Sequence, residues 1–84
     1  MAKIVLDVAK LRMWRAYRGL TKHKMSQLMG YAGDGYYYIE SGKVVPSLAR
    51  INQICEILDI SPLDILVIED EKKEGEHENI DEVR

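Results

Sequence analysis

Apolar residues recur at helical spacing in five short segments of the chain. Within each segment, residues three or four positions apart are apolar and most of the residues between them are polar, as in amphipathic helices with one buried face. The predicted stripes are Val8, Leu11 and Trp14; Met25, Leu28 and Met29; Tyr36 and Ile39; Leu48, Ile51, Ile54, Cys55 and Leu58; and Ile65 and Leu66. The pattern therefore predicts an all-α fold of five short helices over about residues 7–68.

Residues that begin and end helices separate these stripes. The expected N-terminal residues are Asp7, Thr21, Pro46-Ser47 and Ser61-Pro62, the last with Asp64 as the acid of a capping box. Gly19, Gly30 and Gly42 follow the first three helices, where a left-handed residue closes the last turn. These signals favour five separate helices joined by short connections.

Two further segments, Ile4-Val5-Leu6 and Leu66-Val67-Ile68, are β-prone. They could pair, within one chain or across a dimer. We favour the alternative, in which both are apolar ends that pack on the helical core.

The net charge of −2 hides a strong asymmetry. Residues 1–30 hold seven basic residues and one acid, a net +6, whereas residues 31–68 hold two basic residues and five acids, a net −3. Residues 69–84 hold three basic residues and eight acids, a net −5. A charge run is often only a solvated face. We assign residues 1–68 to one domain and residues 69–84 to an acidic tail that is expected to be disordered, because it cannot bury apolar surface.

Composition excludes several classes of function. The single cysteine, Cys55, rules out an intrachain disulfide, and His23 and His77 lack the spacing of a zinc site. No apolar run is long enough to span a bilayer or to act as a signal peptide, so we expect a cytoplasmic protein without a membrane partner. Neither Ser41 nor Ser47 has a histidine at a meaningful spacing. We therefore expect no enzyme, cofactor, metal or small-molecule substrate.

The ordered pattern over about residues 8–66 resembles the lambda-repressor/Cro-type (XRE) helix-turn-helix family. The matching residues are Leu11, Arg15, Gly19, Leu20 and Thr21; Met25, Ser26, Met29, Gly30 and Tyr31; Tyr36, Ile39, Glu40 and Gly42; Pro46, Ser47 and Leu48; and Ile51, Ile54, Leu58, Ile60 and Ile65. The resemblance implies a compact five-helix DNA-binding domain whose third helix enters the major groove of double-stranded DNA. It also implies an ion pair between Arg15 and Glu40, with two separate surface charges as the alternative.

The resemblance places DNA contacts on the second and third helices. Lys22 and Lys43 are expected to contact phosphates. The recognition surface would present Gly33, Asp34, Tyr37, Tyr38 and Ser41. Arg, Lys, Gln and Asn, which read guanine and adenine edges, are absent from this surface. Asp34 is expected to cap the third helix. The alternative is that its carboxylate accepts a hydrogen bond from a cytosine amino group.

Two functions remain open at this point. The first is a sequence-specific transcriptional regulator that binds a palindromic operator as a homodimer. In the resembling proteins the C-terminal helix carries the dimer contact, and its candidates here are Leu63, Leu66, Val67 and Ile68, unless these residues close the monomer core. The second is a protein-interaction module of the same fold, antitoxin-like, which binds its partner through Tyr37 and Tyr38.

Overall fold

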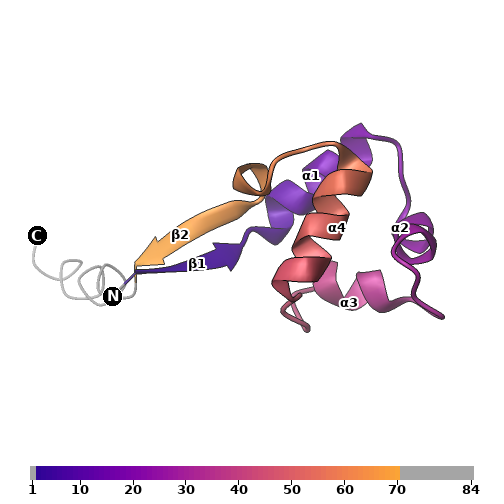
Figure 1. Ribbon diagram of the computed structural model, residues 1–84, viewed down its shortest axis with the longest axis horizontal. Coiled ribbons are helices and arrows are strands. Elements are labelled where there is room, and N and C mark those ends of the chain that lie inside the picture. The colour runs from indigo at the N-terminus through magenta and orange to yellow at the C-terminus, as the bar shows by residue number, and fades with distance from the viewer. Residues whose placement is uncertain (1, 71–84) are drawn as a thin grey trace, which may run out of the picture.

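A two-stranded ribbon projects from a group of four short α-helices (Figure 1). The structure is a computed structural model and describes residues 2–70. In chain order the elements are β1 (Ala2–Leu6), α1 (Val8–Tyr17), α2 (Lys22–Leu28), α3 (Gly35–Glu40), α4 (Leu48–Leu58), the single 3₁₀ turn η1 (Pro62–Asp64) and β2 (Leu66–Asp70). From residue 71 onwards, the acidic tail that is predicted to be disordered lies outside the residues that the structure describes.

Local signals in the sequence begin and end the helices where they are expected. The Asp7 carboxylate accepts hydrogen bonds from the backbone N–H groups of Ala9 and Lys10, at 3.1 and 3.2 Å, and so caps α1. Thr21 and Ser47 cap α2 and α4 in the same way. The residue after the C-cap of each of the first three helices is a glycine with φ between +74° and +85°. A side chain there would be strained, which explains the glycine at each position.

The core lies between α4 and the other three helices. Its buried members are Leu11, Met25, Met29, Tyr36, Ile39, Ile51, Ile54, Cys55, Leu58 and Ile65. All ten belong to the predicted stripes. Two other members of the stripes, Leu28 and Leu48, are instead 46% and 69% exposed. The helical period identifies the buried face, but it does not show which residues at the edge of that face reach a neighbour.

The prediction of an all-α domain with five helices is wrong. The residues predicted to form the fifth helix make one 3₁₀ turn, in which Ser61 and Asp64 do form a capping box. The chain then enters β2, which pairs antiparallel with β1. The hydrogen bond from Asp7 N–H to the Ile65 carbonyl, at 2.8 Å, adjoins this strand pair where both strands leave the helices. A long-range pairing of β-prone segments therefore replaces the helix that the local signals favour.

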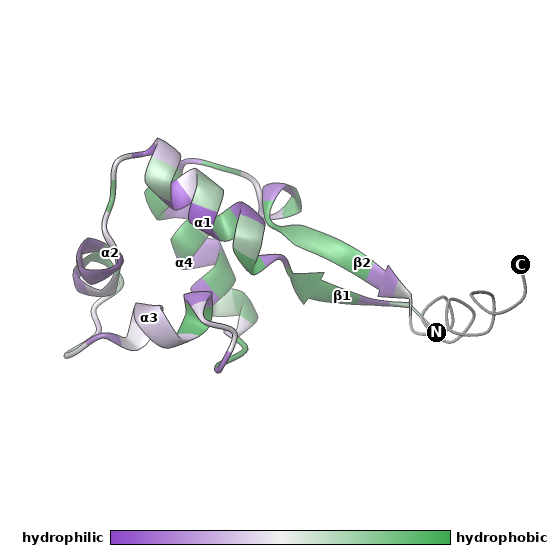
Figure 2. Ribbon diagram, turned by 180° about the vertical axis from the view of Figure 1, so that it is seen from behind, coloured by the Kyte–Doolittle hydropathy of each residue, from purple (hydrophilic) through white to green (hydrophobic). Residues whose placement is uncertain are grey.

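The register of the ribbon sorts its side chains onto two faces. Ile4 lies opposite Ile68, Val5 opposite Val67 and Leu6 opposite Leu66. Because side chains alternate along a strand, both isoleucines share one face with Leu6 and Leu66. The ribbon is apolar along most of its length (Figure 2). The packing on the core that we favoured for these segments holds only at the base, where Leu6 and Leu66 contact the core.

Candidate nucleic-acid interface

The turn between α2 and α3 fixes the helix-turn-helix geometry. Gly30 ends α2 in the left-handed conformation, and the Tyr31 N–H donates to the Ser26 carbonyl at 3.0 Å. Ser26 is 1% exposed, and its hydroxyl oxygen accepts a hydrogen bond from the Tyr36 N–H at 3.0 Å. A small polar side chain at this position therefore lets the two helices approach closely and holds the first turn of α3 against α2.

Asp34 is the N-cap residue of α3, as predicted, but its side chain accepts no capping hydrogen bond. Its backbone torsion angles, φ −97° and ψ 43°, differ from the extended conformation of the residues that cap α1, α2 and α4. The carboxylate lies 3.6 Å from Nδ1 of His23 on α2, and both side chains are exposed. Because Ser26 binds an N–H in the first turn of α3, Asp34 is left on the outer surface.

Arg50 holds the turn from the α4 side, a role that the sequence did not reveal. Its guanidinium lies 4.2 Å from the centre of the Tyr31 ring, and Nη1 donates to the Met29 carbonyl at 2.9 Å. Tyr31 in turn packs against Gly35, where an added Cβ would lie 2.5 Å from the ring. No local spacing connects Arg50 with a tyrosine 19 positions earlier, so only the fold brings these groups together.

Glu40 at the end of α3 is buried and is held by α1. Its carboxylate accepts hydrogen bonds from Arg15 Nε at 2.7 Å, Arg15 Nη2 at 3.0 Å and the Tyr36 hydroxyl at 2.7 Å. Arg12 Nε lies 3.6 Å from the same carboxylate. Glu40 is 2% exposed, so this is a buried, bidentate ion pair that ties α1 to α3.

The pKa values of these groups follow from that arrangement. Burial alone would raise the pKa of Glu40, but the hydrogen bonds from Arg15 and Tyr36 outweigh it, and the pKa lies below its ordinary value. The hydrogen bond to Glu40 raises the pKa of Arg15. Burial, and then the bond to the carboxylate, raise the pKa of Tyr36. All three groups therefore keep a fixed protonation state near neutral pH.

Four predicted contact residues form one continuous outer surface, which we call the Lys–Tyr surface: Lys22, Tyr37, Tyr38 and Lys43. The Lys22 ammonium lies 4.8 Å from the centre of the Tyr37 ring, and the Lys43 ammonium lies 6.0 Å from that of Tyr38. The two tyrosine rings meet edge to face at 5.6 Å. All four side chains are exposed. The order along the surface is thus cation, ring, ring, cation, with positive charge at both ends.

The loop after α3 is organised by one carbonyl group. The Tyr38 carbonyl accepts from the Lys43 and Val44 N–H groups, at 3.1 and 3.2 Å, and from the Ser41 hydroxyl at 3.0 Å. Ser41 is thereby engaged with the helix end, although it remains exposed. Gly33 lies in the exposed turn before α3. The loop is therefore tied to the helix that carries the two tyrosines.

Arg12 adds a cation beside this surface that we did not include among the predicted contacts. It is 56% exposed and lies close to Glu40, whose carboxylate also feels the charge of Lys22. The sequence did contain a signal for this residue, because Arg12 lies three positions before Arg15 and therefore on the same face of the helix. Arg15 neutralises Glu40, so the exposed cations here are Arg12, Lys22 and Lys43. The opposing negative charge is that of Asp34.

The four residues predicted to form a dimer contact do not lie on a C-terminal helix. Leu63 is on η1 and is 81% exposed. Leu66, Val67 and Ile68 are on β2, where Leu66 is partly buried while Val67 and Ile68 are exposed. The helical contact surface implied by the resemblance is therefore replaced by a turn and a strand. The part of these residues in a dimer stays a prediction.

Residues 2–70 show few features of other kinds of site. They contain no group of three or more His, Cys, Asp or Glu side chains that could hold a metal ion. Cys55 is buried in the core, and burial raises the pKa of its thiol, which disfavours the reactive thiolate. None of the described helices has both the length and the apolar character needed to cross a membrane.

Comparison with known families agrees with this geometry. The family model described as a helix-turn-helix domain matches residues 8–65, a range that includes all four α-helices and η1. No curated protein and no solved structure matches the chain. The matched family is related to the XRE-type DNA-binding domains, which confirms the resemblance, and such families are typically non-enzymatic. The chain therefore belongs to the helix-turn-helix domain family, and this membership indicates a DNA-binding regulator.

Proposed function

We propose that this protein is a non-enzymatic transcriptional regulator that binds a palindromic DNA operator as a symmetric homodimer. The observation that carries the proposal is the Lys–Tyr surface on the outer side of α3. Its two tyrosines lie on α3, the helix that the family resemblance places in the major groove, and its two lysines, at the start of α2 and in the loop after α3, stand at opposite ends. The exposed charge there is mainly positive, as a phosphate backbone requires.

The lysines supply affinity in this proposal. Each ammonium group packs over a tyrosine ring, at 4.8 Å for Lys22 and 6.0 Å for Lys43, while the side chain stays exposed. The rings restrict the lysine rotamers before binding, so less side-chain entropy is lost when a phosphate is contacted. Arg12 extends the same positive surface toward α1.

The tyrosines supply the remaining contact in place of the usual base readers. Tyr37 and Tyr38 can donate hydrogen bonds from their hydroxyls to phosphates, and their rings can pack on thymine methyl groups. Neither residue reads guanine or adenine with a pair of hydrogen bonds. Sequence preference therefore comes largely from the shape and deformability of the DNA.

The test is the salt dependence of duplex binding for Lys22→Ala and Lys43→Ala. The logarithm of the binding constant falls linearly with the logarithm of the salt concentration, and each lost phosphate contact makes this negative slope shallower by about 0.9. A symmetric dimer loses two contacts per substitution, so the slope should become shallower by about 1.8 for either variant. Affinity at low salt should fall for all duplex sequences alike, because phosphates are common to every sequence.

Lys10→Ala is the matched control. Lys10 is exposed on α1, and the helical rotation of 100° per residue places it on the face opposite Arg12 and Arg15, which point toward α3. Its removal takes away one positive charge and no proposed contact. An equal fall in slope for Lys10→Ala would reduce the effect to net charge and contradict the proposed surface.

A further inference from the structure

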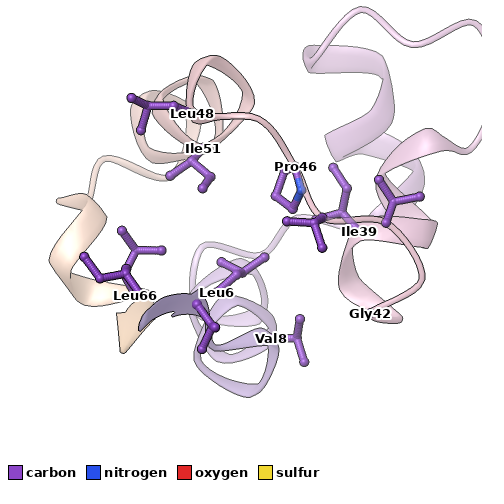
Figure 3. A pocket seen from close by; sticks show the side chains of 12 residues that line it. Leu6, Val8, Ile39, Gly42, Pro46, Leu48, Ile51 and Leu66 are labelled. Carbon is purple, nitrogen blue, oxygen red and sulfur yellow. The ribbon is translucent and has the colours of Figure 1, made fainter. Parts of the chain in front are cut away.

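An apolar groove of about 450 Å³ lies between the ribbon and the start of α4. Figure 3 shows side chains from the ribbon, from α4 and from the α3–α4 loop around one common space. Its lining includes Ile4, Leu6, Ile39, Val45, Leu48 and Leu66. None of the residues that line it carries a charge or a polar side chain. No side chain of the groove can therefore bind a phosphate or a charged side chain.

The rim of the groove is exposed and apolar. Val45 is 89% exposed, Leu48 69% and Ile4 68%. Ile68, which pairs with Ile4 on the same face of the ribbon, is 69% exposed as well. Single exposed apolar residues are ordinary, whereas a contiguous set around a groove marks a surface that is covered in the functional state.

The ribbon itself lacks cover at its outer part. Leu6 and Leu66 pack against the core at its base, but Ile4 and Ile68 lie beyond them and remain exposed. Two strands alone are marginally stable in water, and they need a further layer on their apolar face. The outer part of the ribbon therefore presents an exposed apolar face, at Ile4 and Ile68, that requires a partner surface.

We propose that the apolar ribbon face of a second copy, at Ile4 and Ile68, covers this groove, and that the first ribbon covers the groove of the second copy in return. One two-fold arrangement then covers both features at once, because every copy offers one apolar ribbon face and one groove. Lys3 and Glu69, which lie 4.0 Å apart, are on the opposite face of the ribbon from Ile4 and Ile68, since side chains alternate along a strand. Residues 71–84 are a poor occupant, because Ile80 and Val83 are their only aliphatic residues.

The contact would also couple dimerisation to DNA binding, and this part rests on the proposed function. The groove is lined by Ile39 on the inner side of α3 and by Val44 and Val45 next to Lys43. A ribbon seated there fixes the loop that carries Lys43. It therefore sets the position of one end of the Lys–Tyr surface in each copy.

The first test measures self-association of the full chain without DNA, by sedimentation equilibrium. Val45→Asp and Ile68→Asp should each weaken dimerisation by about 100-fold or more, because each places a carboxylate in an apolar contact. Both positions are exposed in the single chain, so the helical circular dichroism should stay unchanged. Met13→Asp is the control, since Met13 on α1 is 54% exposed but does not line the groove, and this variant should still dimerise. A monomeric wild type, or loss of the dimer only in Met13→Asp, would overturn the proposal.

The second test fixes which surfaces meet. Val45→Cys and Ile68→Cys chains are mixed and oxidised, with Cys55 buried in both. The proposal expects a disulfide between the two different variants. A disulfide only between two Ile68→Cys chains would indicate ribbons paired edge to edge with empty grooves, and would overturn it. Neither test contains DNA, so a protein that dimerises in this way but binds no duplex would contradict the proposed function alone.

Discussion

Arg15→Met offers a strong test of the buried ion pair that ties α1 to α3. The substitution keeps much of the aliphatic packing of the side chain and removes both hydrogen bonds to Glu40, at 2.7 and 3.0 Å. Glu40 is 2% exposed and would keep only the Tyr36 hydroxyl and the more distant Arg12. Breaking such a pair costs about 3–5 kcal/mol, because the remaining charge is buried without its partner.

The expected loss is large for a domain of this size. Arg15 Nη1 also donates to the Leu20 carbonyl at 2.8 Å, and this bond disappears too. A small domain has roughly 5–10 kcal/mol of total stability, so the variant should lose about half of it. Urea denaturation should show a lower midpoint, and thermal unfolding should show a fall in Tm of at least about 12 °C.

Arg12→Met is the matched control, because Arg12 approaches the same carboxylate. It lies 3.6 Å from Glu40 and is 56% exposed, whereas Arg15 is 14% exposed. An exposed ion pair contributes less than about 1 kcal/mol. Similar losses for the two variants, or a loss below about 1 kcal/mol for Arg15→Met, would refute the reasoning from burial.

The pH dependence gives a second readout of the same pair. The pKa of Glu40 is lowered in the folded protein, so its ionisation stabilises the fold above the unfolded pKa of about 4.3. This stability is lost as the pH falls through the lower, folded pKa. In Arg15→Met, burial dominates and the folded pKa rises above that of the unfolded chain. The difference in stability between wild type and variant should therefore be small near pH 3 and grow toward pH 7.

Two further substitutions test the packing of α2 against α3. Gly35→Ala should reduce the free energy of unfolding by about 1–3 kcal/mol, because its Cβ would lie 2.5 Å from the Tyr31 ring. Gly33→Ala, with nothing within 4 Å of its Cβ, should be neutral or stabilise by up to about 1 kcal/mol, and equal losses would argue against the contact. Ser26→Ala should cost about 1–3 kcal/mol and speed hydrogen exchange at the Tyr36 amide, since it removes that amide's acceptor. A change below about 0.5 kcal/mol would mean that this bond contributes little.

Local pattern predicted the four α-helices well. Helical spacing and capping residues depend on neighbours within one or two turns, so Asp7, Thr21 and Ser47 could be recognised directly. The turn glycines follow from backbone sterics alone. Lys22, Tyr37, Tyr38 and Lys43 came from the family resemblance, and the fold brings these four side chains together.

The errors arose where distant segments decide the structure. Ser61 and Asp64 form their capping box, yet the helix stops after one turn because Leu66-Val67-Ile68 pairs with a strand 60 or more positions away. Asp34 occupies the predicted cap position, but Ser26 on another helix binds the Tyr36 N–H instead. Local propensity cannot report such contacts, since they depend on which elements the fold brings side by side.

The most direct measurement is selection of the purified full-length protein on a random duplex DNA library, followed by sequencing. The account predicts enrichment of a two-fold symmetric site, with sequence preference that includes DNA shape as well as direct base contacts. Failure to enrich any site, under conditions where the protein is folded and dimeric, would contradict it. That result would instead favour a protein-interaction module that uses Tyr37 and Tyr38.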